Sequence, residues 1–457
     1  MIDCPRCVVL ERELAELRAR VASLEKDSSN SSKPPSSDIV KAENPKQKRG
    51  RSKRKRGAQP GHAKHRRPAF STEEVDAAYD YYFDRCPDCG GEVKLLAEPA
   101  SILQQVEFVE RPIEISEHRS RTCHCTRCQK DFVATLPREV RKAGLVGPQL
   151  TALISYMKGA CHCSFSTIRK FLRDVVKVTI SCGQLRRVCA KVAHSLDNAY
   201  EGLLKWLPHQ DFLNVDETGH KEYAKRMWTW CFRAPLFTLF HISPSRGSEV
   251  LLNVLGQEFD GVLGCDYFSA YHKYMRLNKN VLVQFCLAHL IRDVRFLVEH
   301  PNPKNQAYGK RLLAEIRKMF AIIHNRDKMT KADFLADLET QGVWVCHHAM
   351  FRVPNTKEAQ NMADRFRKHG NEYIRFITTP GIQPTNNLAE QAIRFVVIDH
   401  RVTLGSRSKA GREWLERIWT TIATCAQQGK SVFGFFVQSI NAFFAGTAGP
   451  SLRPEPG

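Results

Sequence analysis

Hydrophobic spacing divides the chain into helix-forming and strand-forming stretches. Between residues 7 and 24, apolar side chains recur at heptad spacing with Glu and Arg between them, which predicts an amphipathic helix. Two core heptad positions are apolar throughout: Cys7, Leu10, Leu14, Leu17, Val21 and Leu24. We expect this helix to pair in a short parallel coiled coil; docking of a single helix on its own chain is the alternative.

A second helical stretch covers residues 141–207. Three segments in it have helical spacing: 148–159, 165–176 and 183–196. Ser181 precedes the third segment and fits an N-cap, and Arg186 and Arg187 follow on that helix. The arrangement is typical of a helix-turn-helix with a DNA-reading second helix, although plain helix packing explains the same pattern.

Strand patterns dominate from residue 211 onward. Apolar runs predict five strands, at 211–220, 226–234, 236–244, 261–268 and 281–286, and two helices, at 247–256 and 269–275. Three strands, a helix, a strand, a helix and a strand is the order of a ribonuclease-H-like α/β sheet, an order that other folds share. The stretch 290–375 has helical spacing, as do 384–397, 411–428 and 431–445.

Positive charge is concentrated in one segment. The chain has a net charge of +21, and residues 41–67 hold twelve Lys or Arg against one acid, Glu43. The densest run is Lys53, Arg54, Lys55 and Arg56. Clustered cations bind polyanions by releasing counterions from phosphates, so we expect contacts to nucleic acid. An anionic membrane surface is the alternative partner.

The sequence predicts a cytoplasmic protein. No apolar run reaches the roughly 18 residues of a membrane-spanning helix, and the first residues, "MIDCPRC", lack the layout of a secretory signal. Sixteen cysteines in such a protein indicate free thiols or metal ligands rather than disulfides.

Two Cys-x-x-Cys pairs predict a metal site. Cys86 and Cys89 lie in "CPDCGG", and Cys125 and Cys128 lie in "CTRC". Structural Zn²⁺ is commonly held by four thiolates from two such turns, so we expect a zinc-binding domain of short strands, one of them at 104–115. Reduced buried cysteines are the alternative. The Cys4 and Cys7 pair and Cys123 have no assigned role.

Acidic residues stand at the ends of two predicted strands. Asp216 is expected at the end of the first strand and Asp266 at the end of the fourth, while Glu390 comes from a helix. Three carboxylates with open positions suit Mg²⁺ or Mn²⁺, and two such ions assist phosphoryl displacement. Glu217 is the alternative to Asp216, because neighbouring strand residues point to opposite faces. The pattern also fits unrelated surface acids.

A cysteine–histidine pair and two arginines are further candidate site residues, and for His289 a satisfied core histidine is the alternative. Cys286 and His289 are three residues apart, on one helical face after the fifth strand. Arg394 shares a helix face with Glu390, and Arg246 lies in "SPSRGSE". Arginine can bind phosphate bidentately, although solvated ion pairs are the default for both arginines.

The blocks that carry these residues resemble DDE transposases of bacterial insertion sequences, most closely the insertion-sequence sixty-six group. The blocks are "NVDETGH" with "WTWCF", "GCDYFSAYHKY" with "CLAHLIRDV", and "PTNNLAEQAIR" with "LGS". The N-terminal order is similar too: zipper-like helix, "NSSKPPSSD", basic segment near "GAQPGH", cysteine domain and helical domain. The "CHC" at 123–125 and "VTLGSRSKAGREW" depart from the pattern, outside the three acids.

The resemblance implies that Asp216, Asp266 and Glu390 hold the metal ions and that Glu217 is a neighbour. It implies a DNA transposase that hydrolyses a phosphodiester at element ends and transfers the 3′ hydroxyl to target DNA. The expected partners are DNA, a second copy of the chain or a higher oligomer, and accessory proteins encoded by the element, with the protein at the nucleoid. An inactive DNA-binding repressor and a ribonuclease-H-like nuclease without strand transfer are the alternatives.

These expectations define a multidomain α/β chain. The expected domains are a coiled-coil helix (1–27), a disordered basic linker (28–70), a zinc-binding β domain (71–140), a helical DNA-binding domain (141–207), a ribonuclease-H-like catalytic domain (208–295 and 376–428), a helical insertion (296–375) and a C-terminal helix with a tail (429–457).

Overall fold

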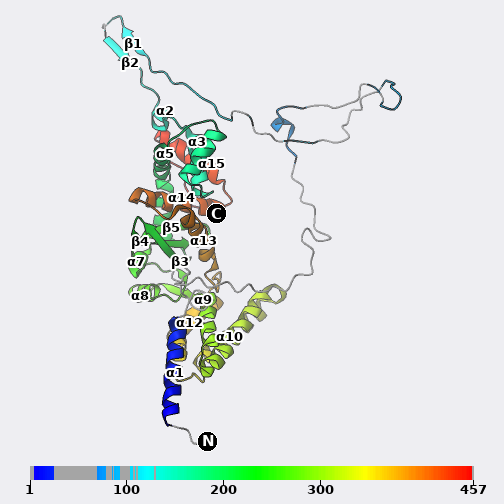
Figure 1. Ribbon diagram of the computed structural model, residues 1–457, viewed down its shortest axis with the longest axis vertical. Coiled ribbons are helices and arrows are strands. Elements are labelled where there is room, and N and C mark those ends of the chain that lie inside the picture. Colours follow the sequence, from blue (N-terminus) through cyan, green and yellow to red (C-terminus); the bar gives the residue numbers. More distant parts are fainter. Residues whose placement is uncertain are drawn as a thin grey trace. The chain divides into compact units, whose positions relative to one another are not determined.

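The computed structural model (Figure 1) describes most of the chain after residue 111 and parts of the chain before it. The described residues are 5–24, 69–78, 85, 87–92, 103–105, 109, 112–127 and 130–454. The chain forms two compact units, one of Met1–Ala42 with Glu117–Gly457 and one of Glu43–Ser116. The predicted linker and basic run, with Lys53, Arg54, Lys55 and Arg56, lie outside the described residues. None of the described helices has both the length and the apolar character needed to cross a bilayer.

The N-terminal helix forms where heptad spacing predicts it. α1 spans Pro5–Leu24. Its apolar side chains at heptad positions are exposed: Leu10, Leu14, Leu17, Val21 and Leu24. An exposed apolar row of this kind is what a coiled-coil partner would cover, and the pairing itself stays a prediction.

Short elements lie between residues 70 and 135. η2 spans Thr72–Glu74, and β1 (Thr122–Cys125) pairs antiparallel with β2 (Lys130–Val133). No strand is found among the described residues of 103–120, so the strand expected at 104–115 is not seen at those positions. Pro112 contributes to this result, because proline has no N–H to donate to a sheet.

A group of short helices follows. It comprises α2 (Arg138–Ala143), α3 (Pro148–Gly159), α4 (Phe165–Asp174), α5 (Cys182–Ser195), α6 (Asp197–Trp206) and η3 (Leu207–His209). α3, α4 and α5 match the three predicted helical segments to within two residues. The Ser181 side chain accepts the backbone N–H of Gln184 at 3.1 Å, which confirms the N-cap.

A five-stranded mixed sheet forms the centre of the larger unit (Figure 1). Its elements in chain order are β3 (Phe212–Glu222), β4 (Lys225–Arg233), β5 (Thr238–Ser243), α7 (Ser248–Leu255), β6 (Val262–Cys265), α8 (Ser269–Leu277) and β7 (Leu282–Phe285). The strand order is β5-β4-β3-β6-β7. β3, β4 and β5 pair antiparallel, whereas β6 is parallel to β3 and β7 to β6. All five strands and both helices occur in the predicted order.

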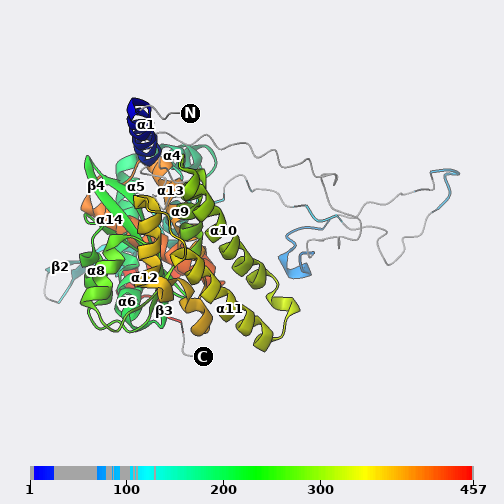
Figure 2. The same ribbon diagram turned by 90° about the horizontal axis from the view of Figure 1, so that it is seen from below.

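The remaining chain is helical. It comprises α9 (Leu287–Glu299), α10 (Pro303–His324), η4 (Arg326–Lys328), α11 (Lys331–Met350), α12 (Lys357–Thr378), α13 (Asn387–Thr403), α14 (Lys409–Gln427) and α15 (Val432–Ala445). Figure 2 shows α10 and α11 as a long pair that extends away from the sheet. α12 returns to β7, and α13 packs on β3 and β4.

Helix α14 covers β5, one edge of the sheet. Three backbone N–H groups of β5 donate to side-chain oxygens spaced four residues apart on α14: Thr238 to Thr424 at 3.2 Å, Phe240 to Thr420 at 3.0 Å, and Ile242 to Glu416 at 2.7 Å. The repeat of two residues on the strand therefore matches one turn of the helix. This pairing removes the free edge that would otherwise be open to another strand.

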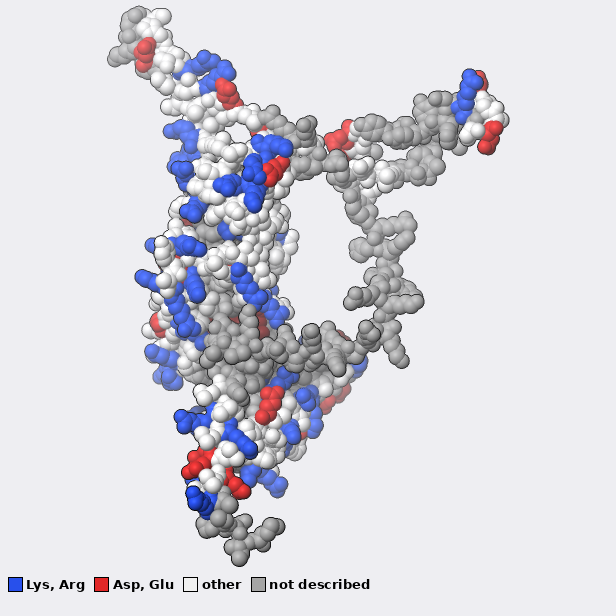
Figure 3. All heavy atoms as spheres, in the orientation of Figure 1, with Lys and Arg blue, Asp and Glu red and all other residues white. Residues whose placement is uncertain are grey.

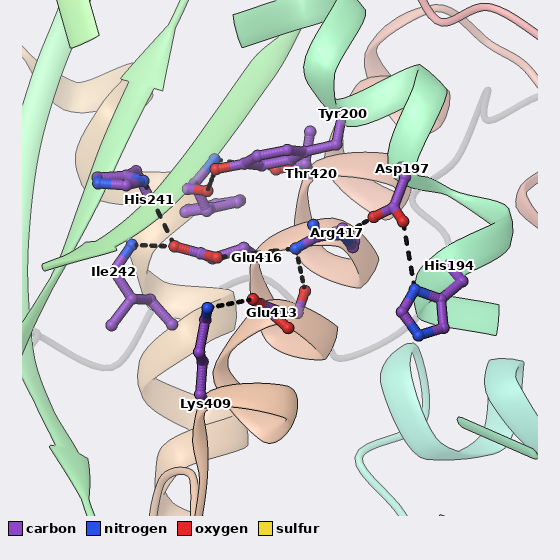
Figure 4. Close-up of polar contacts among 11 residues, drawn as sticks. His194, Asp197, Tyr200, His241, Ile242, Lys409, Glu413, Glu416, Arg417 and Thr420 are labelled. Carbon is purple, nitrogen blue, oxygen red and sulfur yellow. Dashed lines mark hydrogen bonds and ion pairs between the residues drawn. The ribbon is translucent and has the colours of Figure 1, made fainter. Parts of the chain in front are cut away.

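The same helix joins the sheet to α6 (Figure 4). Glu416 lies 3.4 Å from His241 Nδ1 and 3.9 Å from Arg417. Arg417 pairs with Asp197 of α6 and lies over the ring of Tyr200. Burial raises the pKa of Glu416 to about 7.

This raised pKa predicts how stability depends on pH. The folded chain holds the Glu416 proton more tightly than the unfolded chain, where the pKa is about 4.3. The stabilisation that this tighter proton binding gives the folded chain is complete below about pH 4 and is lost as the pH rises through about 7. Glu416→Gln keeps an acceptor for Ile242 without the charge. As the pH rises from 5 to 8, we therefore expect the unfolding free energy of the variant to increase by up to about 3 kcal/mol relative to that of the wild type.

Urea unfolding at both pH values measures this difference. Glu413→Gln, one turn earlier on α14 and beside Lys409, is the matched control, because the Glu413 side chain is 35% exposed. Equal pH dependence in the wild type and Glu416→Gln would contradict the expectation.

Candidate active site

The register of two parallel strands brings Asp216 opposite Asp266. β3 continues to Glu222, so Asp216 lies inside the strand, and the expectation that the strand ends there is wrong. The strand continues because its pairing with β4 extends well past Asp216. The parallel ladder with β6 pairs Asn214 with Gly264, which places Asp216 opposite Asp266, the residue that directly follows β6. Both aspartates therefore lie at the carboxyl end of the parallel pair.

The two aspartates have no neighbouring cation. Asp216 accepts the N–H of Glu217 at 2.9 Å, and Asp266 accepts the N–H of Phe268 at 3.0 Å. Within the described chain, no Lys, Arg or His nitrogen lies within 4.0 Å of either carboxylate. Asp266 is buried, while Asp216 keeps part of its surface exposed.

Burial and like charge shift both carboxyl groups toward the protonated form. Burial, together with the charges of Glu217, Asp266 and Glu390, raises the pKa of Asp216 well above its ordinary value. Burial and then the charge of Glu217 raise the pKa of Asp266 to about 8, although the more distant Arg246 opposes the shift. A nearby cation would favour the charged form of both groups, so the pair is a candidate cation site.

Glu217 differs from Asp216 because both of its oxygens have partners. Arg246 donates to Oε1 from Nε at 2.8 Å and from Nη2 at 2.6 Å. Tyr271 donates its hydroxyl to Oε2 at 2.8 Å. The guanidinium also lies over the rings of Trp228 and Phe268. Arg246 therefore balances the charge of Glu217 inside the protein, and both Glu217 oxygens already accept hydrogen bonds.

Helix α13 brings the third acid to this region. Asn386, just before the helix, donates its side-chain N–H to the carbonyl of Val215 at 2.8 Å. This bond ties the start of α13 to β3 beside Asp216. Glu390 lies one turn later, and its charge contributes to the raised pKa of Asp216. Arg292 of α9 donates to Glu390 Oε1 at 3.3 Å.

Cys286 and His289 both lie close to Glu390. The Cys286 sulfur, a ring nitrogen of His289 and a Glu390 oxygen all lie within 4.8 Å of one another. His289 Nδ1 is 3.5 Å from Glu390 Oε1, and burial lowers the pKa of His289 to about 3. The Cys286 sulfur accepts the backbone N–H of Asn386 at 3.2 Å. Among the residues that the structure describes, neither aspartate belongs to this group of mutually close donors.

The predicted DNA contacts have different surroundings. Arg186 and Arg187 of α5 and Arg394 of α13 are exposed, as a phosphate contact requires. Arg246 is bound to Glu217 in an internal ion pair, and His289 is buried.

The predicted zinc ligands are described in part. Arg85 and Glu92 form an antiparallel bridge around the turn that contains Cys89. Cys125 ends β1, where the hairpin to β2 turns. Cys86, Cys128 and the side chain of Cys125 lie outside the described residues, so the zinc site stays a prediction.

Three residues that contact Glu217, Glu390 or β3 have no role predicted from the sequence: Tyr271, Arg292 and Asn386. Arg292 lies in "CLAHLIRDV" and Asn386 in "PTNNLAEQAIR", two blocks that carry the resemblance, but their partners are far away in the chain. The one signal that could have identified them is their closeness in sequence to candidate site residues, Arg292 to His289 and Asn386 to Glu390.

The ion pair between Glu217 and Arg246 predicts a large effect on stability. Arg246→Met leaves Glu217 buried and without a cation, which costs about 3–5 kcal/mol. Urea unfolding measures this loss. We expect Arg246→Met with Glu217→Gln to recover most of the loss, because the uncompensated charge is then removed. A loss below about 1 kcal/mol in the single variant would show that the pair behaves like a solvated surface pair.

Comparison with known proteins places the chain in a family. A family model described as "Transposase IS66 family" matches residues 143–413, and a "Family of unknown function (DUF6444)" matches residues 7–68. A protein of Sinorhizobium fredii, "Uncharacterized protein y4qI", is 22% identical over 373 residues, which cover 75% of this chain and 67% of that protein. The first match spans more than half of the chain and includes the aspartates of the sheet and Glu390. The chain therefore belongs to the IS66 family of transposases.

Proposed function

We propose that this transposase hydrolyses a phosphodiester at the ends of its insertion sequence and transfers the 3′ hydroxyl to target DNA, with Asp216, Asp266 and Glu390 as ligands of Mg²⁺ or Mn²⁺. The observation that carries the proposal is the pair of adjacent aspartates, neither of which has a cation within 4.0 Å among the residues that the structure describes. The order of strands and helices is the one predicted for a ribonuclease-H-like domain, here assigned to 208–295 and 376–428.

The donor set fits a hard divalent cation. Carboxylate oxygens are the protein ligands that Mg²⁺ prefers, and it keeps other positions for water and phosphate. Asp216 and Asp266 have free carboxylate oxygens, whereas the oxygens of Glu217 are occupied. When bound, two such ions supply stabilisation to the attacking and the leaving oxygen of an in-line displacement.

The protein side chains have separate tasks in this scheme. Asp216 is part-exposed, so substrate can approach from its side, while Asp266 and Glu217 form the buried wall. Glu390 completes the ligand set by turning from Arg292 toward Asp216. Arg292 is then free to approach a phosphate oxygen. Arg394, exposed one turn after Glu390, adds a second cation for the DNA backbone.

DNA binding is assigned to the N-terminal half. The basic segment with Lys53, Arg54, Lys55 and Arg56 would bind phosphates without reading bases, and α5 would contribute Arg186 and Arg187. Figure 3 shows Lys and Arg spread over the drawn face, with fewer Asp and Glu. The zinc domain held by Cys86, Cys89, Cys125 and Cys128 would support this grip.

Pairing of two DNA ends calls for at least two copies of the chain. The exposed apolar row of α1 supplies a surface for a homodimer or higher oligomer. Action on element ends places the protein at the nucleoid, in the cytoplasm, where accessory proteins of the element are further candidate partners.

Removal of one acid predicts loss of catalysis. Asp266→Asn removes a ligand and several kcal/mol of transition-state stabilisation, so cleavage should fall by roughly a thousandfold or more. The assay is Mg²⁺-dependent nicking of DNA that carries the ends of the element. Asp260→Asn, an exposed acid at the other end of β6, is the matched control and should remain active.

The same assay separates the alternatives. A repressor would bind end DNA without cleaving it in any divalent metal. A nuclease without strand transfer would nick DNA but leave a supplied pre-cut 3′ end unjoined. Normal cleavage by Asp266→Asn would overturn the assignment of the site.

Metal binding also predicts a change in stability without DNA. Millimolar Mg²⁺ should raise the unfolding temperature of the wild type by about 1–3 °C, because it binds only the folded site. Asp266→Asn should lose this increase. It should also be at least as stable as the wild type without metal, since it has one buried carboxylate fewer. Differential scanning calorimetry measures both, and equal stabilisation of the two proteins would count against the site.

A further inference from the structure

Three donors of mixed chemistry surround one point beside the proposed active site. Cys286 is the N-cap residue just before α9, His289 lies on the first turn of that helix, and Glu390 approaches from α13. Their sulfur, nitrogen and oxygen atoms are all within 4.8 Å of one another. A thiolate, an imidazole and a carboxylate are the three side-chain ligands that zinc uses in proteins.

The nitrogen and the sulfur are available for a metal. His289 is buried, and among the described residues its Nδ1 has no hydrogen-bond partner, although it lies 3.5 Å from Glu390 Oε1. The Cys286 sulfur accepts an N–H from Asn386, a bond that also stabilises a thiolate. A buried nitrogen without a partner is a cost to the fold that a metal ion would remove.

We propose that Cys286, His289 and Glu390 form a Zn²⁺ site that competes with Mg²⁺ for the Glu390 carboxylate and so inhibits the transposase. Ligands of one tetrahedral zinc lie about 3.5 Å apart, so the observed spacing needs a small closing movement. Three protein ligands leave the fourth position to water. Binding displaces the thiol proton of Cys286, which passes to solvent.

Competition follows from the position of Glu390. The carboxylate is held toward α9 by Arg292 at 3.3 Å, on the side of Cys286 and His289. Zinc would keep it there, whereas the Mg²⁺ site needs it beside Asp216. Magnesium binds thiolate and imidazole poorly, so higher Mg²⁺ would relieve the inhibition by drawing Glu390 toward the aspartates and not by taking the place of zinc between α9 and α13. The inhibition part of this inference rests on the proposed function, and the binding part does not.

Cobalt binding to the full-length protein tests the site without DNA. Co²⁺ reports thiolate coordination through sulfur-to-cobalt charge-transfer absorption, and the predicted Cys86, Cys89, Cys125 and Cys128 site contributes equally in every variant. We expect Cys286→Ser to bind one Co²⁺ fewer than the wild type. Glu390→Gln should bind this ion roughly tenfold more weakly or worse.

A matched control checks that the loss is specific to α9. Cys425→Ser changes another buried cysteine, on α14, and should bind as many Co²⁺ ions as the wild type. Equal Co²⁺ stoichiometry in Cys286→Ser and the wild type would overturn the site.

Zinc inhibition tests the competition. The ratio of Mg²⁺-dependent nicking with and without micromolar Zn²⁺ is measured within each protein. The wild type should be inhibited at least tenfold, with relief at higher Mg²⁺, and Cys286→Ser should be inhibited much less. Equal inhibition of both proteins would overturn the competition. An absence of nicking in every protein would instead refute the proposed function, because the Co²⁺ measurement would still report the site.

Discussion

Negative charge gathered in a poorly solvated region is the constraint on which this structure depends. Asp216, Glu217, Asp266 and Glu390 affect one another electrostatically. Arg246 neutralises Glu217, and Arg292 contacts Glu390, so within the described chain the two aspartates are left without a close cation. Desolvating an unpaired carboxylate is costly, and this cost is the physical basis for proposing that a divalent cation binds there.

The scaffold prevents the acids from moving apart to relieve this repulsion. The ladder between β3 and β6 holds Asp216 opposite Asp266, and the bond from Asn386 to Val215 holds α13 against the same strand. Both edges of the sheet are also covered. α14 satisfies the N–H groups of β5, and at β7 the Gln284 side chain exchanges hydrogen bonds with the backbone of α12. These contacts hold the strands and α13 in place, so the acids stay close together although their charges repel.

Local patterns in the sequence predicted the helices and strands. The contact partners of the site residues depend instead on the tertiary fold. Alternation and heptad spacing are properties of neighbouring residues, which is why the helices and the strands β3 to β7 were predicted. The continuation of β3 past Asp216 depends on pairing with β4. The choice between Asp216 and Glu217 depends on Arg246, 29 residues away. The family resemblance implied Asp216, Asp266 and Glu390 as the metal ligands, an assignment that stays a prediction. No local pattern showed that Glu217 is paired with Arg246.

Glu390 differs from the aspartates because it has two alternative sets of neighbours. Asp216 is fixed within strand β3, and Asp266 is fixed at the end of strand β6. Glu390 instead extends from helix α13, between α9 and β3. On one side lie Arg292, His289 and Cys286, and on the other lies the unpaired charge of Asp216. Without metal, repulsion from Asp216 and attraction to Arg292 both favour the α9 side. In the function proposed above, a cation between the aspartates would reverse the first of these forces, so metal occupancy and the position of Glu390 would be coupled.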